Sequence, residues 1–268
     1  MAETNSTRYA QIIERIFFAH FHQGAEEVPF DRSEIVGAAS DLNVRLPKNL
    51  GDVVYSFKYR TPLPESVVAS APSGKEWVIV NRGKAKYAFV ARRTARIQPD
   101  SMLVVTKIPD ATPGIVSMYA LSDEQALLAK LRYNRLLEIF SGVACYSLQS
   151  HLRTTVPGMG QVETDELYVG VDKRGAHYVF PVQAKGGSDE LGVVQIEQDI
   201  ALCRDKFPSL ICRSIAAQFM PGGVIAMFEL EIENDEVRKV AERHYQLVPP
   251  DELSEEELLR YRTRSEAE

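Results

Sequence analysis

The sequence predicts an α/β protein in two parts: a helical N-terminal region that ends in a β-hairpin, and a C-terminal mixed sheet flanked by helices. Apolar residues recur at helical spacing as far as residue 59, whereas β-type runs separated by turns dominate from residue 76 onward. A helix-spaced segment stands among the later runs, which is typical of an α/β domain. The 268 residues, 45% of them hydrophobic, are enough for two domains, which we place at 1–120 and 121–268.

The first region should contain three short helices. Apolar residues in 4–23 fall on one side of a helix, after the capping residues Asn5 and Ser6. A second helix is expected to begin at Asp31 or Ser33 and to end at residue 39. A third helix is expected over residues 50–59.

A basic β-hairpin follows these helices. Runs 76–80 and 87–91 flank a turn, 81–86, that holds one arginine, two lysines and a glycine. Three helices and a hairpin form a winged helix, in which the third helix enters the major groove of DNA and the hairpin contacts the backbone. A winged helix can instead bind protein, but the positive charge favours double-stranded DNA. The side chains expected at DNA are Lys48, Asn49, Lys58 and Arg60 from the helices and Arg82, Lys84 and Lys86 from the hairpin.

Charge is divided unevenly along the chain. Although the net charge is −6, residues 45–107 hold twelve Lys and Arg against four Asp and Glu, a net charge of +8. Residues 227–268 hold six against thirteen, a net charge of −7, and end in an acidic helix predicted from Ser254. A basic segment can contact phosphates, so the negative total does not exclude a nucleic-acid partner.

The middle of the chain carries two β-type runs and then a predicted long helix. The runs, 102–106 and 114–118, lie on either side of a proline-containing loop, and we interpret 92–119 as a linker or an extension of the hairpin. Residues 122–125 form a capping sequence for a helix over 126–152. This helix would open the second domain.

A second hairpin collects polar side chains that suit metal chemistry. Runs 166–171 and 177–182 flank a short polar turn that ends in glycine, which is typical of a hairpin. Asp165 precedes the first strand, and Gln183 and Lys185 follow the second on one face, because side chains alternate along a strand. A carboxylate, an amide oxygen and an amine would therefore meet. Carboxylates and neutral oxygens are the ligands that Mg²⁺ prefers.

The pattern around this hairpin resembles a nuclease family. Asp165 is followed eighteen positions later by Gln183-x-Lys185, then by two glycines and the helix-spaced segment VVQIEQD. This arrangement resembles the PD-(D/E)xK nuclease superfamily, and type II restriction endonucleases in particular, over about residues 127–231. The sequence departs from the family pattern in two ways. No proline precedes Asp165, and glutamine replaces the acid at position 183.

The resemblance implies a restriction-endonuclease-like fold and Mg²⁺-dependent hydrolysis of phosphodiester bonds. On this basis Asp165 holds Mg²⁺, Gln183 supplies a neutral ligand, and Lys185 positions the attacking water. With glutamine at position 183, the metal then has one negatively charged ligand fewer. Glu138, from the first helix of the domain, or Glu163, on the strand face of Asp165, would restore it.

The remaining elements complete the second domain. Strands are expected over 210–219 and 223–231, and a helix over 191–207. The helix presents three polar side chains on one side, spaced so that they can brace the candidate site. These side chains are Gln195, Gln198 and Asp199.

Together these observations predict a two-domain, metal-dependent endonuclease that cuts double-stranded DNA, of the type II restriction class. The alternatives are a DNA repair or junction nuclease of the same fold, and a DNA-binding regulator without activity. Two-fold symmetry is the simplest way to cut both strands, so we expect a homodimer. The sequence shows neither a membrane span nor a secretion signal, and we expect a cytoplasmic protein. Three cysteines without CxxC spacing predict buried thiols rather than disulfides or zinc ligands.

Overall fold

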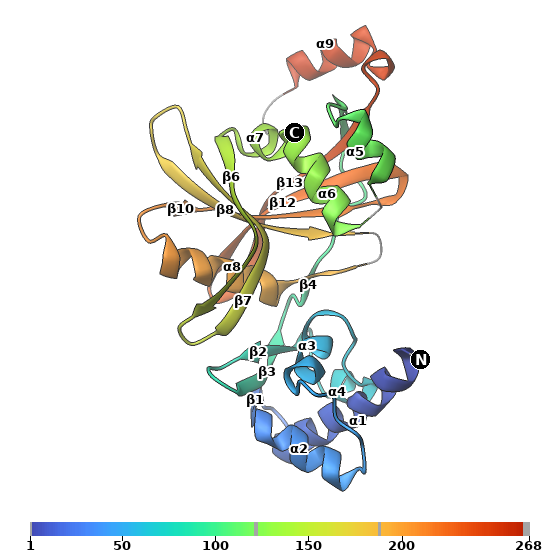
Figure 1. The fold of residues 1–268 in the computed structure, drawn as a ribbon, viewed down its shortest axis with the longest axis vertical. Coiled ribbons are helices and arrows are strands. Elements are labelled where there is room, and N and C mark those ends of the chain that lie inside the picture. Colours follow the sequence, from blue (N-terminus) through green and yellow to red (C-terminus); the bar gives the residue numbers. More distant parts are fainter. Residues whose placement is uncertain (1, 121–122, 187–188, 265–268) are drawn as a thin grey trace.

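The computed structural model describes residues 2–120, 123–186 and 189–264, which form two packed modules (Figure 1). Ser122 of the predicted capping sequence and Gly187 of the glycine pair lie outside the described residues. The smaller module, at the bottom of Figure 1, combines helices with a three-stranded antiparallel sheet of order β1-β3-β2. Its elements are α1 (Ala2–His20), β1 (Glu27–Asp31), α2 (Arg32–Asp41), α3 (Gly51–Tyr59), α4 (Glu65–Ala69), β2 (Glu76–Asn81) and β3 (Lys86–Arg92).

The three predicted helices and the hairpin form near the predicted positions, but strand β1 and helix α4 were not predicted. Helix α1 begins at Ala2, so Asn5 and Ser6 lie within the helix rather than before it, and the predicted caps are wrong. Ile12, Ile16 and Phe17 recur on one side of α1 and are buried in the module core. Helix α2 begins after Asp31, whose backbone N–H donates a hydrogen bond to the Glu34 side chain (2.7 Å). Strands β2 and β3 pair antiparallel, as expected for the basic hairpin.

The larger module is built on a mixed sheet with helices on both faces, so the predicted α/β class is confirmed. The described strands run in the order β5-β13-β12-β11-β8-β7-β6, with β10 paired to β8. The strands are β5 (Val105–Pro109), β6 (Ala144–Val156), β7 (Gly160–Val171), β8 (His177–Lys185), β10 (Ile211–Cys212), β11 (Ser214–Phe219), β12 (Val224–Glu233) and β13 (Glu236–Val248). The helices are α5 (Gly114–Tyr119), α6 (Glu124–Tyr133), α7 (Leu136–Ser141), α8 (Val193–Lys206) and α9 (Glu255–Thr263), with short 3₁₀ turns at Pro221–Gly223 and Pro250–Glu252.

Strand β8 carries the alternation that separates the two faces of this sheet. Phe180 belongs to the buried cluster that contains Leu131 of α6, whereas the preceding residue, Val179, belongs to the cluster that contains Leu202 of α8. Helix α6 therefore covers one face of the sheet and α8 covers the other (Figure 1).

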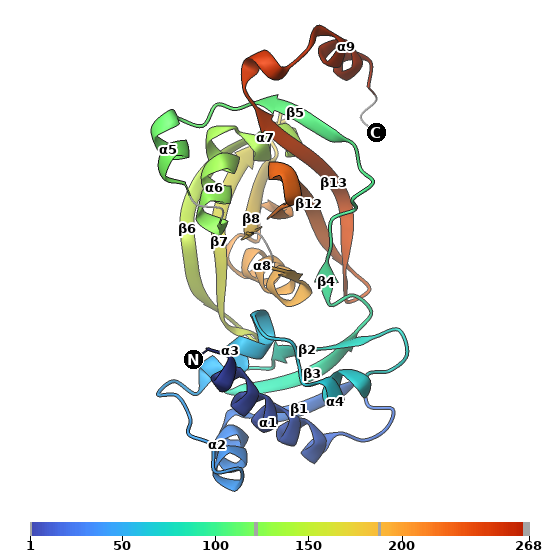
Figure 2. The same cartoon turned by 90° about the vertical axis from the view of Figure 1, so that its right-hand side faces the viewer.

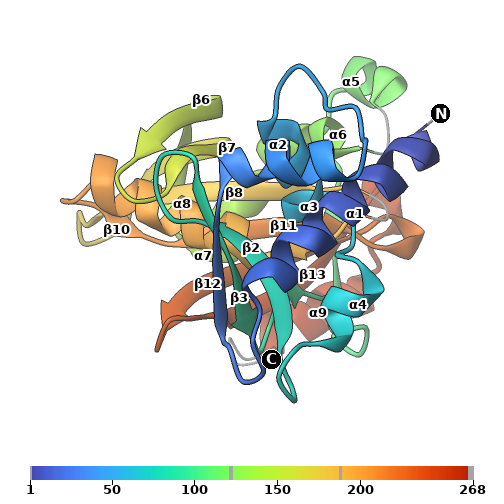
Figure 3. The same ribbon diagram turned by 90° about the horizontal axis from the view of Figure 1, so that it is seen from below.

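Helix α8 lies between the large sheet and the small sheet (Figure 2). Ile196 of α8 belongs to one buried cluster that includes Val80 and Ala88 of the small sheet and Phe228 of the large sheet. Helices α1 and α2 cover the opposite face of the small sheet, and Figure 3 views the molecule from that side. The modules are thus layered as helices, small sheet, α8 and large sheet.

Polar contacts tie the modules together beside this cluster. The hydroxyl of Tyr59, the last residue of α3, donates a hydrogen bond to Gln198 Oε1 of α8 (2.7 Å). Asn81 Nδ2 at the end of β2 donates to the backbone carbonyl of Met159, in the turn between β6 and β7 (2.6 Å). Both contacts join the smaller module to the elements that carry the candidate site.

The predicted long helix over 126–152 is wrong. Helix α6 ends at Tyr133, and the chain turns through left-handed backbone at Arg135 (φ 51°) and Gly142 (φ 70°) on either side of the short helix α7. The following residues form β6, which pairs with β7 along its length. Long-range strand pairing therefore overrides the local helical spacing of this segment.

The interpretation of 92–119 as a linker or hairpin extension is also wrong. Strand β4 (Arg96–Ile97) pairs with β9 (Leu191–Gly192), and β5 pairs in parallel with β13, so this stretch belongs to the larger module. Residues 114–118 lie in helix α5 rather than in a strand, because Pro113 fixes the backbone just before the first helical turn.

Two further expectations concern the state of the cysteines and the presence of a membrane-spanning helix. Cys145 and Cys203 are buried and Cys212 is half-buried, and all three are free, as predicted. No helix within the described ranges is long and apolar enough to cross a membrane.

Candidate active site

The predicted site lies where strands β7 and β8 separate. Their pairing runs from Val171 opposite His177 to Glu166 opposite Val182 and then stops. Two residues beyond Val182, the backbone N–H of Ala184 donates a hydrogen bond to the side chain of Asp165 (Oδ2, 2.9 Å). The carboxylate of Asp165 is therefore held where the pairing of β7 with β8 ends. Asp165 lies inside β7 rather than before it, because β7 extends back to Gly160 in its pairing with β6.

Lys185 reaches this site at the end of β8 and is 8% exposed. Its ammonium donates a hydrogen bond to Glu124 Oε1 (2.9 Å). Glu124 is the first residue of α6, after Asp123, which caps the helix by accepting from the Ala126 N–H (2.9 Å). The helix thus begins directly beside the end of β8.

Gly186 permits this close approach. A Cβ atom at Gly186 would lie 3.0 Å from Asp123 Cα and 3.3 Å from the Glu124 backbone nitrogen, closer than side chains normally pack. The glycine after Lys185 therefore has a steric role. Because glycine has no side chain, the start of α6 can lie beside it, which brings Glu124 within hydrogen-bond distance of Lys185.

The charge of Glu124 acts on the carboxyl group of Asp165. Burial raises the pKa of Asp165, and the nearby Glu124 carboxylate raises it further. The Ala184 N–H, Lys185 and His151 oppose that rise. Two carboxylates and one lysine therefore converge where the middle of β7 meets the end of β8 and the start of α6. Sequence reasoning missed Glu124 as a site residue, because it treated 122–125 only as a helix cap.

Gln183 lies on the predicted strand face but is directed toward α8. Its side chain is 1% exposed, and Nε2 donates to Asp199 Oδ2 (2.9 Å) and to the Glu163 backbone carbonyl (3.3 Å). Its Oε1 accepts from Gln195 Nε2 (3.2 Å). The amide oxygen expected at the metal is thus engaged by a donor of α8, and the face of α8 braces the strand through Gln183.

Asp199 is the most deeply buried acid of this network. Burial raises its pKa well above the ordinary value, with the Asp165 charge acting in the same direction and the hydrogen bond from Gln183 opposing it. One oxygen of Asp199, Oδ1, has no hydrogen-bond partner among the described residues. These conditions favour the neutral, protonated carboxyl.

The two candidate extra carboxylates are each paired with an arginine. Glu163 forms an ion pair with Arg153 of the neighbouring strand (3.0 Å). Glu138 pairs with Arg135 (3.0 Å) and lies beside Cys145, which is paired with Gly170 on β7. Gly170 is five residues from Asp165, or about 17 Å along a strand. The structure therefore separates Glu138 from the site, because the helix expected to carry it ends at α6.

The predicted DNA-contacting residues divide into exposed and engaged side chains. Lys58 Nζ donates to Asn81 Oδ1 (3.2 Å), and burial lowers its pKa to about 7 against the opposing effect of Glu197. Arg82 makes a two-pronged ion pair with Glu27 (2.8 and 3.0 Å). Arg82 is nevertheless exposed, as are Lys48, Asn49, Arg60, Lys84 and Lys86. Of these, Asn49 also donates a hydrogen bond to Asp52 Oδ1 (2.7 Å).

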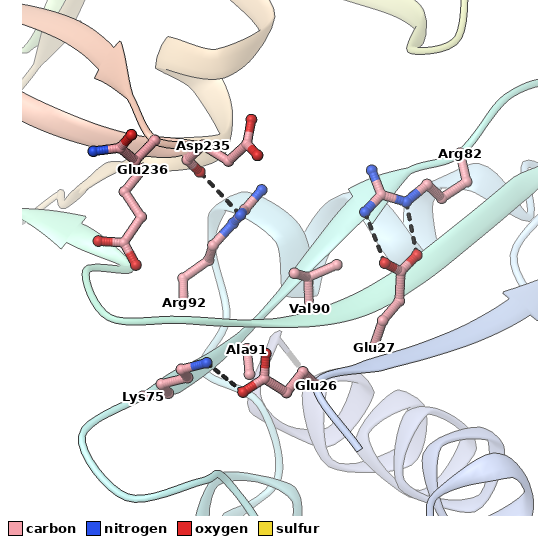
Figure 4. Close-up of a pocket in the computed structure, with 10 residues that line it drawn as sticks. Glu26, Glu27, Lys75, Arg82, Val90, Ala91, Arg92, Asp235 and Glu236 are labelled. Atoms are coloured by element: carbon pink, nitrogen blue, oxygen red, sulfur yellow. Dashed lines mark hydrogen bonds and ion pairs between the residues drawn. The ribbon is translucent and has the colours of Figure 1, made fainter. Parts of the chain in front are cut away.

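A pocket of about 280 Å³ lies away from this site, between the small sheet and the turn from β12 to β13 (Figure 4). Its charged side chains are paired with each other: Lys75 binds Glu26 (2.6 Å), Arg82 binds Glu27, and Arg92 donates to the Asp235 backbone carbonyl (3.0 Å). Because its cations are paired within the protein, the pocket offers little free charge to a ligand.

The acids at the β7–β8 end fit a magnesium ion. No three His, Cys, Asp or Glu side chains in the described part of the chain are grouped as a metal-binding cluster. Mg²⁺ does not need three, because it keeps several waters and takes one or two carboxylates from the protein. Asp165 and Glu124 supply that number, and a cation beside them would offset the mutual repulsion that raises the Asp165 pKa.

Comparison of the chain with protein-family models, curated proteins and solved structures gave no match. The functional inference therefore depends on the contacts of Asp165, Lys185 and Glu124.

The pH dependence of stability tests the protonation of Asp199. Because its folded pKa is raised, the protonated group contributes stability that is complete below its unfolded pKa, about 3.9, and is lost as pH rises through the folded value. Asp199→Asn has no proton to lose. Its free energy of unfolding should therefore gain on that of the wild type by about 1.4 kcal/mol per pH unit between the unfolded and the folded pKa of Asp199, and the difference should level off above the folded pKa.

Urea unfolding between about pH 5 and about pH 8 measures this difference. Asp205→Asn, on the exposed end of α8, is the matched control and should track the wild type. Parallel profiles for Asp199→Asn and the wild type would show that Asp199 is ionised in the folded protein.

Proposed function

We propose that this chain is a Mg²⁺-dependent endonuclease that hydrolyses phosphodiester bonds of double-stranded DNA, with a PD-(D/E)xK-like site of the type II restriction class. The observation that carries the proposal is the meeting of Asp165, Lys185 and Glu124 where β7 and β8 separate. The sequence alone brings Asp165 and Lys185 together, and the fold adds the second acid. The site thereby regains the negative charge that is missing when glutamine stands at position 183.

Each side chain has a defined part in this chemistry. Asp165, fixed by the Ala184 N–H, and Glu124 would hold Mg²⁺, which lowers the pKa of bound water and offsets charge on the phosphate. Lys185, fixed by Glu124, orients the water that attacks phosphorus. A new P–O bond forms to this water as the bond to one ester oxygen breaks, leaving a phosphate end and a hydroxyl end.

The smaller module is proposed to bind the duplex as a winged helix. Its order of helices and strands, with β1 beside the hairpin, suits that arrangement. The exposed Arg60 follows α3, and Lys84 and Lys86 stand on the hairpin. Arg153 of β6 lies within electrostatic range of the exposed Tyr55 of α3, so a duplex on α3 would run toward the strand beside Asp165.

A second candidate function is a DNA-binding regulator without nuclease activity. The engagement of Gln183 by Gln195 and Asp199 favours it, because the side-chain oxygen of Gln183 is then not free for the metal. The two functions share the DNA-binding proposal and differ only in hydrolysis. A homodimer that places two sites across the duplex remains our expectation for the nuclease.

Digestion of supercoiled plasmid with Mg²⁺ tests the proposal. Asp165→Asn and Lys185→Ala should each lower the cleavage rate by about 100-fold or more, and Glu124→Gln by about 10- to 100-fold, because each loses a group at the reacting phosphate. Glu138→Gln is the matched control, since Glu138 pairs with Arg135 outside the site, and should cleave as the wild type does.

The pattern of products separates the candidates. Discrete fragments support the restriction class, and nicks confined to unusual DNA structures support a repair or junction nuclease. Full cleavage by Asp165→Asn would refute the site, and DNA binding without cleavage by the wild type would favour the regulator.

The hairpin is tested by the salt dependence of DNA binding. Replacing Lys84 and Lys86 together by alanine should reduce the slope of log affinity against log salt by about 0.9 for each phosphate that the hairpin no longer neutralises. Arg82→Ala should change the slope less, because Glu27 already neutralises Arg82. Fluorescence anisotropy of a labelled duplex measures both slopes. An unchanged slope in the double variant would mean that the hairpin does not touch DNA.

A further inference from the structure

His151 lies beside the proposed site on β6, an edge strand of the large sheet in the described fold. Ser150 pairs with Glu166 and Leu152 pairs with Thr164, so the register sets His151 opposite Asp165. His151 is exposed. His151 is also close enough to act on Asp165, since it is among the groups that oppose the rise of the Asp165 pKa.

The backbone at His151 is unusual for a strand. Its φ is +49°, in the left-handed region that residues with a β-carbon rarely adopt, although the residues on both sides are paired with β7. Backbone strain of this kind concentrates at sites of function. At His151 it interrupts the regular alternation of β6 beside the acid of the proposed site.

A side chain of helix α6 forms a hydrogen bond with one nitrogen of the His151 imidazole. Gln125 Nε2 donates a hydrogen bond to His151 Nε2 (3.1 Å). An amide NH₂ can only donate, so His151 Nε2 accepts and the proton of the neutral ring lies on Nδ1. Among the described residues, none bonds to Nδ1. Gln125 follows Glu124 directly, so the first turn of α6 positions both Lys185 and His151.

We propose that His151 is a further catalytic residue, whose Nδ1–H donates a hydrogen bond to a phosphate oxygen of DNA at Asp165 and Lys185. This inference rests on the proposed function. The arrangement meets the needs of a phosphate donor: an exposed imidazole, a donor N–H directed by a second hydrogen bond, and a place opposite the metal-binding acid. A contact with phosphate would also account for the positive φ at His151.

Two substitutions separate the side chain from the backbone. Glycine and asparagine both accept a positive φ, so His151→Gly and His151→Asn should keep the fold. Glycine removes the donor, whereas asparagine retains a shorter N–H donor. His177→Asn, at the exposed far end of β8, is the matched control. Thermal unfolding checks that each variant is folded.

Two readouts are measured. The first is the single-turnover rate of supercoiled plasmid cleavage with Mg²⁺, and the second is the dissociation constant for a fluorescein-labelled duplex in Ca²⁺. His151→Gly should slow cleavage by about 10- to 100-fold and weaken binding by about 2- to 5-fold. His151→Asn should fall between His151→Gly and the wild type, and His177→Asn should match the wild type.

The outcomes separate this inference from the proposed function. Wild-type cleavage by His151→Gly, in a preparation where Asp165→Asn is inactive, overturns the role of His151 and leaves the nuclease intact. If the wild type itself does not cleave, the proposed hydrolysis is refuted. The dissociation constants measured in Ca²⁺ then test whether His151 contacts phosphate. An unchanged dissociation constant for His151→Gly then overturns the phosphate contact, and one that is about 2- to 5-fold weaker supports it.

Discussion

The burial of helix α8 between two sheets is the constraint on which the rest of the structure depends. A helix that covers one sheet usually keeps a solvated side, where polar residues need no partners in the protein. Here both sides are covered, so Gln195, Gln198 and Asp199 require internal hydrogen bonds. Gln183 of β8 and Tyr59 of α3 provide them. One helix thereby fixes the smaller module and supports the strand that carries the candidate site.

This constraint explains the residue at position 183. A carboxylate there would share a buried site with Asp199, and two acids placed so close together cannot both be ionised. A glutamine instead donates to Asp199 and accepts from α8. The negative charge that the proposed site needs then comes from Glu124, across the ion pair with Lys185, and Gly186 leaves room for α6 to approach. In the proposed site, the second acid therefore belongs to the helix rather than to the strand.

The sequence predicted the parts of the site that depend on local pattern. Alternation and the turn glycine define the β7–β8 hairpin, which brings Asp165 and Lys185 close to each other. Glu124 escaped prediction because it lies 61 positions from Lys185, and no local pattern reports such a contact. The direction of Gln183 depends on the buried partner Asp199 rather than on strand alternation. Strand β6 was mistaken for helix because its apolar residues also fit helical spacing, whereas pairing with β7 is a long-range effect.

The proposed chemistry requires that Asp165 of β7 and Glu124 of α6 hold a divalent cation where DNA is cut. Anomalous scattering from crystals soaked in Mn²⁺, which takes the same oxygen ligands as Mg²⁺, tests this most directly. We predict a peak between the carboxylates of Asp165 and Glu124 that disappears in Asp165→Asn crystals. A peak that persists in the variant, or a wild-type map with no Mn²⁺ at Asp165, would contradict it.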